Sequence, residues 1–252
     1  MKLTDYLTFL SYSKTLEELW AAHTEQMAEY GFVRLLYGFT QFRTATSLGD
    51  PEDFVILTNH CQDYIDGFIN SGLYFHAPML RWALENEGAG SWRMISELMV
   101  TEAADCPKMR EVHAFNARFG VKAGYTVSFN SVSPRAKGAI SLCAAKHLDQ
   151  AAVDAIWAEH GQDLLLMNNM AHLKILTLPY TAPNRALTRR QREALQWVGD
   201  GKTIQDIAML MGLTSATVEK HLRLARESLA VETTAQAVLK ATLQNQMFLV
   251  EA

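Results

Sequence analysis

Four side chains able to bind nucleic acid share one face of an expected helix: Thr217, Lys220, Arg223 and Arg226. An apolar stripe occupies the opposite face: Val218, Leu222, Ala225 and Leu229. Such a helix packs on its neighbours through the stripe while its polar side enters a major groove, which admits one α-helix. The pattern predicts a recognition helix, although a solvated helix of any small bundle shows the same amphipathic pattern.

Catalytic side chains form no recognised motif in this sequence. It contains no glycine-rich phosphate loop, no nucleophile elbow, and no pair of histidines at i, i+4 with a glutamate. Asp50, Glu52 and Asp53 do cluster, but at an expected helix start, where acids favour the helix dipole. The three cysteines are scattered, without the spacing of a metal site. We therefore expect no enzyme, no phosphoacceptor domain, no metal site and no cofactor.

The helices that must position the recognition helix begin at four threonines: Thr188, Thr203, Thr214 and Thr234. A hydroxyl at such a position accepts a hydrogen bond from the first helical turn. Thr188 and Gln191 also fit the capping-box pattern. Gly201 and Gly212 follow the first and second helices, where a left-handed residue ends a helix. The pattern predicts an all-α, four-helix helix-turn-helix domain.

Several runs within this region carry a family signature: residues 187–197, Gly201-Lys202-Thr203, Ile207-Ala208 and residues 217–223. Together they resemble the DNA-binding domain of LuxR-type transcriptional regulators. Two positions depart from that family. Gln191 stands where the family usually has Glu, and residues 227–230 read Glu-Ser-Leu-Ala instead of a basic-Lys-Leu ending followed by Gly. The resemblance implies a DNA-binding transcriptional regulator.

Two kinds of DNA contact are expected from this domain. We expect groove and phosphate contacts from Thr217, Lys220, Arg223 and Arg226. We expect backbone-phosphate contacts, through side chains or helix N-termini, from Lys202, Thr203 and Thr214. Residues 187–231 carry seven basic and five acidic side chains, a net charge of only +2. Because phosphate neutralisation supplies most non-specific affinity, we expect modest binding that depends on a homodimer at a pseudo-palindromic site in double-stranded DNA.

The length and composition suit two globular domains. The chain has 252 residues, of which 49% are hydrophobic and 20% charged, so a disordered or fibrous protein is excluded. Pro179 and Pro183 predict a linker over residues 177–186. It separates a ligand-sensing and dimerisation domain at 1–176 from the helix-turn-helix domain at 187–252. The last residues, 244–252, form either a fraying tail or a dimer contact.

The sequence also predicts where the protein acts. No apolar run approaches the roughly 20 residues that a membrane helix needs. The start of the chain has no apolar signal core and places an acid early, at Asp5. Three scattered cysteines suit reduced thiols. We therefore expect a cytoplasmic protein without a membrane partner.

Residues 1–176 mix helical and strand periodicities. Helices are expected at residues 15–30, 53–69, 78–87 and 151–175, and strands at residues 32–42, 123–130 and 138–145. The hairpin-like spacing of the strands predicts an antiparallel sheet with helices on its faces. The N-terminal domain is thus expected to be an α/β/α sandwich, and the whole chain to fall in the α+β class. The helix at 151–175 either packs on its own core or forms a dimer element.

Six positions in the first domain also carry a family pattern: Tyr64, Phe68, Ala77, Pro78, Trp92 and Gly124. Their spacing is similar to that of the acyl-homoserine-lactone-binding domain of LuxR-type quorum sensors, with weak similarity over residues 15–175. Pro78, Trp92 and Gly124 match that family. Tyr64 replaces its usual Trp, Phe68 its usual Tyr and Ala77 its usual Asp. The aromatic residues either line an apolar ligand pocket or simply fill a core.

The departures imply a changed ligand. In the family, the Trp donates to the lactone carbonyl, the Tyr serves the acyl carbonyl and the Asp accepts from the ligand's amide N–H. Tyr64 keeps a donor, whereas Phe68 and Ala77 keep no polar group. A buried amide left unpaired costs about 1–3 kcal/mol, so losing two anchors implies roughly ten- to thousandfold weaker binding of a standard lactone. Thr126 and Cys143 stand where small polar residues often complete the pocket.

The sequence thus predicts a LuxR-type transcriptional regulator that responds to a small apolar effector other than a standard acyl homoserine lactone. The same substitutions also suit a pocket filled by side chains, which needs no ligand. The alternative function is a ligand-independent antiactivator that forms heterodimers with another LuxR-type regulator. The acidic residues Glu219 and Glu227 on the expected recognition helix are compatible with that alternative.

Overall fold

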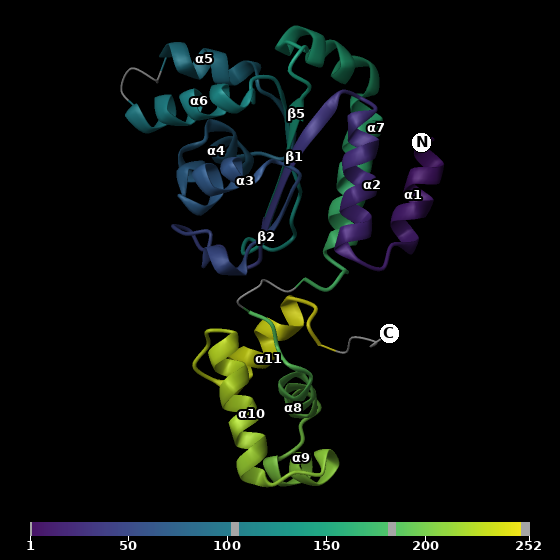
Figure 1. Ribbon diagram of the computed structural model, residues 1–252, viewed down its shortest axis with the longest axis vertical. Coiled ribbons are helices and arrows are strands. Elements are labelled where there is room, and N and C mark those ends of the chain that lie inside the picture. Colours follow the sequence, from purple (N-terminus) through teal and green to yellow (C-terminus); the bar gives the residue numbers. More distant parts are fainter. Residues whose placement is uncertain (1, 102–105, 181–184, 248–252) are drawn as a thin grey trace. The chain divides into compact units, whose positions relative to one another are not determined.

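The computed structural model describes residues 2–101, 106–180 and 185–247, which form two compact units. The first unit comprises Met1–Gly49 and Val55–Ile175, and the second comprises Asp50–Phe54 and Leu176–Ala252. Figure 1 shows both units, with colours that follow the sequence. Residues 181–184 of the expected linker and residues 248–252 of the expected tail lie outside the described residues.

The first unit is built on a five-stranded antiparallel sheet. Its strands are β1 (Phe32–Thr40), β2 (Val55–Thr58), β3 (Gly88–Ser91), β4 (Gly124–Ser128) and β5 (Lys137–Ala144). They lie in the order β2-β1-β5-β4-β3. The central strand β5 pairs with β1 on one side and with β4 on the other. Alternate residues of these strands therefore face two different helical layers.

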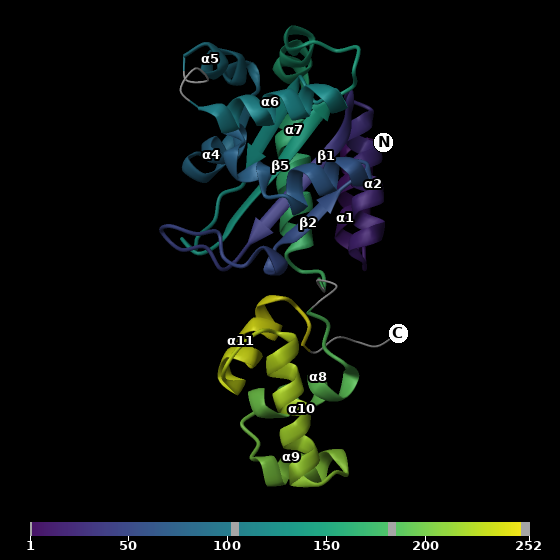
Figure 2. The same cartoon turned by 60° about the vertical axis from the view of Figure 1, so that its left-hand side comes forward.

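Helices cover both faces of this sheet (Figures 1 and 2). One layer contains α1 (Leu3–Tyr12), α2 (Leu16–Ala28) and the long α7 (Gln150–Ile175). The other contains α3 (Gln62–Ile65), α4 (Pro78–Glu85), α5 (Arg93–Thr101) and α6 (Pro107–Phe119). A π-helical turn at Asp66–Asn70 continues α3. The expected α/β/α sandwich with an antiparallel sheet is confirmed.

The expected helix at residues 53–69 is wrong over its first half. Val55–Thr58 form the edge strand β2, in which Val55 pairs with Phe39 of β1. Three of these four residues are β-branched, and such residues favour a strand that packs on a neighbour. Helix α3 begins only at Gln62. The elements α1, β3, α5 and α6 were not expected from periodicity.

The second unit contains four helices: α8 (Arg189–Gly199), α9 (Ile204–Met211), α10 (Ser215–Ser228) and α11 (Thr234–Leu243). The expected caps Thr188, Thr203 and Thr214 are confirmed, and Thr188 forms a capping box with Gln191. The expected cap at Thr234 is wrong, because Thr233 accepts the bond from the Gln236 N–H at 3.2 Å. Gln236, three residues after Thr233, completes that capping box.

A three-residue turn joins α9 to α10. Gly212 ends α9 in the left-handed conformation, at φ +65°, which favours glycine. The Leu213 N–H then donates to the Ala208 carbonyl at 2.8 Å, as in a Schellman motif. Gly201 is likewise left-handed, at φ +79°. Both glycines thus have the conformation expected from the sequence.

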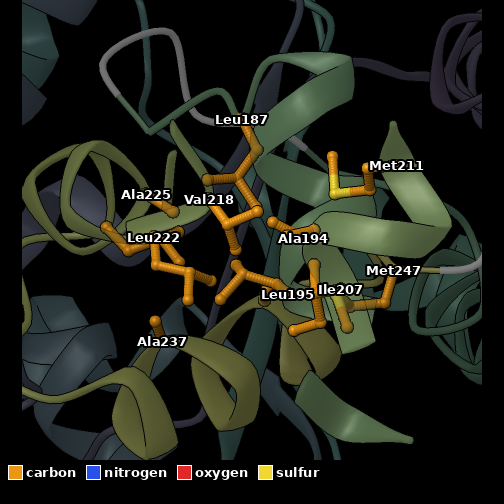
Figure 3. Close-up of a cluster of buried hydrophobic side chains, with 13 residues drawn as sticks. Leu187, Ala194, Leu195, Ile207, Met211, Val218, Leu222, Ala225, Ala237 and Met247 are labelled. Atoms are coloured by element: carbon orange, nitrogen blue, oxygen red, sulfur yellow. The ribbon is translucent and has the colours of Figure 1, made fainter. Parts of the chain in front are cut away.

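The four helices of the second unit share one apolar core (Figure 3). Leu195 of α8, Ile207 of α9 and Val218 of α10 are fully buried, as is Ala237 of α11. Because α10 contributes Val218, Leu222 and Ala225 to this core, its rotation is fixed. Its opposite face must point away from the other helices.

Candidate DNA-reading helix and ligand pocket

The outward face of α10 carries four of the expected DNA-binding residues, which differ in how far they are exposed to solvent. Lys220 and Arg223 are exposed, whereas Thr217 and Arg226 are only partly exposed. Helix α10 begins at Ser215, directly after the turn from α9, so its first residues lie at the tip of the unit. This is the arrangement in which a helix-turn-helix places a recognition helix in a groove.

The three cations of α10 differ in their partners. Arg223 forms an ion pair with Glu227, one helical turn further along. The Arg226 guanidinium donates to the Thr234 hydroxyl at 2.9 Å and so ties α10 to α11. Lys220 has no hydrogen-bond or ion-pair partner within the described part of the chain. Lys220 can therefore offer all of its donors to DNA, whereas Arg223 and Arg226 each already have one terminal nitrogen engaged.

The hydroxyl groups at the helix starts are engaged in capping. Thr214 accepts from the Thr217 N–H at 3.2 Å, and the two hydroxyls lie 2.9 Å apart. The Thr203 hydroxyl donates to Asp206 at 2.7 Å, and this bond lowers the pKa of Asp206. The start of α9 thus carries its own carboxylate, which opposes a phosphate there. Lys202, just before it, is exposed.

Replacing Glu227 by glutamine is expected to strengthen DNA binding. The change removes one negative charge from α10 and frees Arg223 from its ion pair. Each additional phosphate neutralised makes the slope of log K against log salt more negative by about 0.9. We expect about tenfold tighter binding at 50 mM salt and a steeper salt dependence. Fluorescence anisotropy with duplex DNA at several salt concentrations measures both.

The matched control is Glu193→Gln, which breaks the comparable exposed pair between Arg190 and Glu193 on α8. It removes the same charge from a different helix. An equal gain for both variants would show that net charge alone sets the affinity, and not the freedom of Arg223.

In the first unit, four expected ligand-binding residues meet in one apolar cluster. Tyr64, Phe68, Trp92 and Cys143 are all buried there, and Ala77 packs against them. The Tyr64 and Phe68 ring centroids lie 5.1 Å apart. Aromatic residues of α6 complete the packing: Phe115 and Phe119. The cluster lies between the sheet and the layer formed by α3 to α6.

The polar groups in this cluster are already paired. The Tyr64 hydroxyl donates to Asn116 at 2.9 Å, and burial raises the pKa of this tyrosine. The Trp92 indole N–H donates to the Thr126 hydroxyl at 2.9 Å. The Cys143 thiol makes only a weak contact, 3.5 Å from the Ala144 carbonyl, and burial raises its pKa. A ligand that needed the two strong donors would have to break existing hydrogen bonds.

The sheet face beside this cluster carries small residues that solvent reaches. On the central strand β5, Ala139 and Ser141 are partly exposed. Ile140 and Leu142, which alternate with them along the strand, are buried. Ser141 pairs with Leu36 and Thr126 on the neighbouring strands. No described residue hydrogen-bonds the Ser141 side chain. This hydroxyl is thus available to a molecule lying on the sheet.

Sequence reasoning missed Asn116 and Ser141. Asn116 lies on α6, a helix that was not expected. Ser141 could have been predicted from the sequence, because strand periodicity places it on the same face as Cys143, two residues further along. Pro78 has a positional role, since it is the first residue of α4. Ala77 precedes it in extended backbone and contributes no polar side-chain atom.

Buried histidines in the other layer serve packing. His172 accepts from or donates to the Tyr37 hydroxyl at 2.9 Å and stacks on Phe129. His23 hydrogen-bonds Asn168 at 3.2 Å. Burial lowers the pKa of both histidines to about 4, so they are neutral at pH 7. Across the described ranges, no group of three or more His, Cys, Asp or Glu side chains is arranged to hold a metal ion.

Comparison with protein families identifies both units. Residues 15–175 match the autoinducer binding domain. Residues 185–241 match the model described as bacterial regulatory proteins, luxR family. The chain belongs to the LuxR family of transcriptional regulators. The resemblance of the sequence motifs to LuxR-type regulators is thereby confirmed for both halves.

Relatives of this regulator are transcriptional activators. It is 23% identical over 183 residues to the activator ExpR of Dickeya dadantii, covering 68% of this chain and 70% of ExpR. It is 22% identical over 196 residues to the activator CarR of Pectobacterium carotovorum subsp. carotovorum, covering 74% and 77% of the two chains. The regulator is therefore not an enzyme, as expected.

A solved structure shares the fold of the regulator. SdiA in complex with octanoyl-rac-glycerol is 17% identical, with a TM-score of 0.51, and covers 96% of this chain and 93% of its own. At this identity the likeness establishes the fold alone. Within the described residues, none of the helices combines the length and apolar character needed to cross a membrane.

Proposed function

We propose that this regulator binds an apolar acyl effector without an amide N–H and reads a pseudo-palindromic DNA site as a homodimer. One observation carries the proposal. In the apolar cluster beside the sheet, Phe68 and Ala77 offer no polar group, while the donors of Tyr64 and Trp92 are paired internally. The effector would lie between this cluster and the sheet, with its acyl tail on the aromatic rings.

The Ser141 hydroxyl would then be the polar anchor. It is partly exposed on the central strand and has no partner in the described part of the chain. It can donate to one carbonyl oxygen of an ester or ketone. An amide N–H near Ala77 would find no side-chain acceptor, and an unpaired buried amide costs about 1–3 kcal/mol. That cost corresponds to roughly ten- to hundredfold weaker binding.

The ligand in the SdiA complex supports this chemistry. Octanoyl-rac-glycerol is an ester, so it carries an acyl chain and a carbonyl but no amide N–H. A chain of the same fold therefore accommodates a molecule of the class that we propose. The proposal itself rests on the side chains of this regulator.

The DNA-binding residues follow from the exposure of α10 and the turn. Lys220, Arg223 and Arg226 would contact the groove and phosphates together with Thr217. Lys202, Thr203 and Thr214 would contact DNA backbone phosphates at the starts of α9 and α10, as the sequence predicts. Because the proposed target is double-stranded DNA, we propose that the regulator acts in the cytoplasm.

Two probes with the same acyl chain test the effector class. 1-Octanoyl-glycerol and N-octanoyl homoserine lactone are titrated separately into the full chain by calorimetry. We expect the glycerol ester to bind at least tenfold more tightly. Ser141→Ala should weaken the ester at least fivefold, since one hydrogen bond contributes about 1 kcal/mol or more. The double variant Phe68→Tyr/Ala77→Asp should shift the preference towards the lactone.

Each other outcome contradicts part of this proposal. If the lactone binds the unmodified chain more tightly, the missing anchors do not set specificity. If neither probe binds, native mass spectrometry of protein purified from its own host distinguishes a different effector from a pocket filled by side chains. A stoichiometric extra mass there would identify another effector, whereas the same ligand-free protein from every host would show a filled pocket.

The second candidate function is a ligand-independent antiactivator that heterodimerises with another LuxR-type regulator. The ion pair between Arg223 and Glu227 favours it, because it neutralises a cation on the DNA-reading helix. Co-expression with a lactone-responsive regulator of the same host separates the two functions. An antiactivator would co-purify with the lactone-responsive regulator and lower that regulator's DNA binding. The antiactivator itself would bind no DNA detectably, even as the Glu227→Gln variant.

A further inference from the structure

Trp92 of the apolar cluster stands between two residues whose side chains bond the same carboxylate. The Ser91 hydroxyl donates to Asp154 Oδ1 at 2.7 Å, and Arg93 Nε donates to Asp154 Oδ2 at 2.9 Å. Asp154 belongs to α7, in the helical layer on the other side of the sheet from the cluster (Figure 2). Trp92 thus points into the cluster, while both of its chain neighbours reach α7.

The Asp154 carboxylate is shared by four side chains. Besides the bond from Ser91, Oδ1 accepts from the Tyr125 hydroxyl at 3.0 Å and from the Gln150 amide at 2.9 Å. Burial acts to raise the pKa of Asp154, but hydrogen bonds from these side chains, led by Gln150, lower it to about 2. The carboxylate is therefore ionised at pH 7 and acts only as an acceptor.

Gln150 extends this contact to the backbone on which the Trp92 ring lies. The Gly124 N–H donates to Gln150 Oε1 at 3.0 Å, and the Gln150 amide donates back to the Gly124 carbonyl at 3.2 Å. That carbonyl also accepts from the Trp92 backbone N–H at 3.1 Å. A Cβ on Gly124 would lie 3.0 Å from the Trp92 ring, so the ring packs directly on this backbone. The backbone around the ring is thus held from the α7 side of the sheet.

Within the cluster, the Trp92 ring is surrounded mainly by apolar side chains. Its one polar atom is the indole N–H, which donates to the Thr126 hydroxyl. Apolar contacts are non-directional, so they orient a ring less strictly than hydrogen bonds to its chain neighbours do. We propose that Asp154 is a positioning residue of the effector site, which would touch no effector but hold Trp92 in the orientation that the effector contacts. This inference rests on the proposed function, in which the acyl tail lies on the aromatic rings of the cluster.

Positioning of the ring before binding predicts how variants change the affinity. A ring that is already ordered binds more tightly, because less conformational freedom is lost on binding. In calorimetric titrations, Asp154→Ala should weaken 1-octanoyl-glycerol at least fivefold. Arg93→Ala should weaken it only about twofold, because the Arg93 side chain is 60% exposed and solvent screens its pair with Asp154.

Hydrogen exchange of the indole N–H groups tests the positioning without any effector. It is followed by NMR in the isotopically labelled full chain, where the Trp92 signal is the one that Trp92→Phe removes. In Asp154→Ala we expect the Trp92 indole N–H to exchange at least tenfold faster. The buried indole N–H of Trp20, on α2 of the same unit, should keep its rate, because it reports wider opening of that unit.

Two further variants control this experiment. Asp163→Ala makes the same exchange at an exposed position of α7 and should change neither the exchange rates nor the affinity. Ser91→Ala removes one of the two bonds that flank Trp92 and leaves the carboxylate in place. It should speed exchange at Trp92 about threefold, and it decides the question if Asp154→Ala does not fold.

Three outcomes would overturn the inference. The Trp92 indole N–H could exchange as slowly in Asp154→Ala as in the wild type. Trp20 could be accelerated as much as Trp92, which would show that the carboxylate serves only the stability of the unit. The ester could bind Asp154→Ala as tightly as it binds the wild type. A wild type that binds no ester, together with the expected change in exchange, would instead refute the proposed function and leave the positioning of Trp92 by Asp154 standing.

Discussion

Replacing Gly124 by alanine is expected to destabilise the first unit severely. A Cβ on Gly124 would lie 2.2 Å from the Leu142 carbonyl oxygen and 3.0 Å from the Trp92 ring. The carbonyl belongs to the central strand β5, so relief requires β4 and β5 to separate or Trp92 to leave the cluster. Overpacking of this kind costs about 3 kcal/mol or more. Calorimetry of the full chain should show the melting temperature of this unit lowered by about 6–12 °C.

The control is Gly38→Ala, in the adjacent region of the same sheet. A Cβ on Gly38 would meet only the Ile56 Cδ1, at an ordinary contact distance of 3.6 Å. We expect a change of about 1 kcal/mol or less. Equal losses for both variants would mean that glycine flexibility, and not the contact with Leu142, explains the first result.

Acid is expected to destabilise the first unit well above the pH at which its carboxylates are protonated. Burial lowers the pKa of His23, His60 and His172 to about 4 in the folded protein. Their pKa in the unfolded chain is about 6.5. Below pH 6.5 the unfolded chain therefore binds protons that the folded one does not, and the free energy of unfolding falls until about pH 4. At pH 5 each histidine accounts for about 2 kcal/mol of this loss.

His60 offers the cleanest test of this prediction. Its ring stacks on Tyr64 with centroids 4.1 Å apart and an interplanar angle of 20°. His60→Phe keeps an aromatic ring there and removes the titrating nitrogens. The variant should match the wild type at pH 7 and be about 2 kcal/mol more stable than it at pH 5. Chemical denaturation at both pH values measures the difference.

His147→Gln serves as the control, because His147 is exposed. It should leave the pH dependence unchanged. If His60→Phe loses stability with acid as steeply as the wild type, His60 is already charged in the fold and its burial does not exclude a proton.

The second unit could be predicted closely because its signals are local. Thr188, Thr203 and Thr214 each accept a hydrogen bond from the backbone N–H three residues ahead. Gly212 ends α9, and its own N–H contacts carbonyl groups of that same helix. Such patterns are contained within one turn of chain. Even the error at Thr234 is a shift of one residue, because two threonines stand side by side and only the pairing with Gln236 selects Thr233.

The first unit was less predictable because its site is assembled from distant segments. Val55–Thr58 became a strand through pairing with β1, which no local pattern specifies. The Tyr64 hydroxyl found its partner Asn116 on a helix 52 residues away. The family resemblance located Tyr64 and Trp92, but only the folded sheet places Ser141 between Leu36 and Thr126. Long-range pairing therefore decides the chemistry of the pocket.

The strand order β2-β1-β5-β4-β3 also constrains how the protein is made. The central strand β5 is the last of the five to be synthesised, and Phe32 of β1 must wait for Ala144 to pair with it. Until then, β1 and β4 each present an unpaired edge to the crowded cell. Contacts this distant in sequence also form slowly. The nascent chain is thus vulnerable to proteases and aggregation until residue 144 has left the ribosome, so its cellular abundance is decided partly during translation.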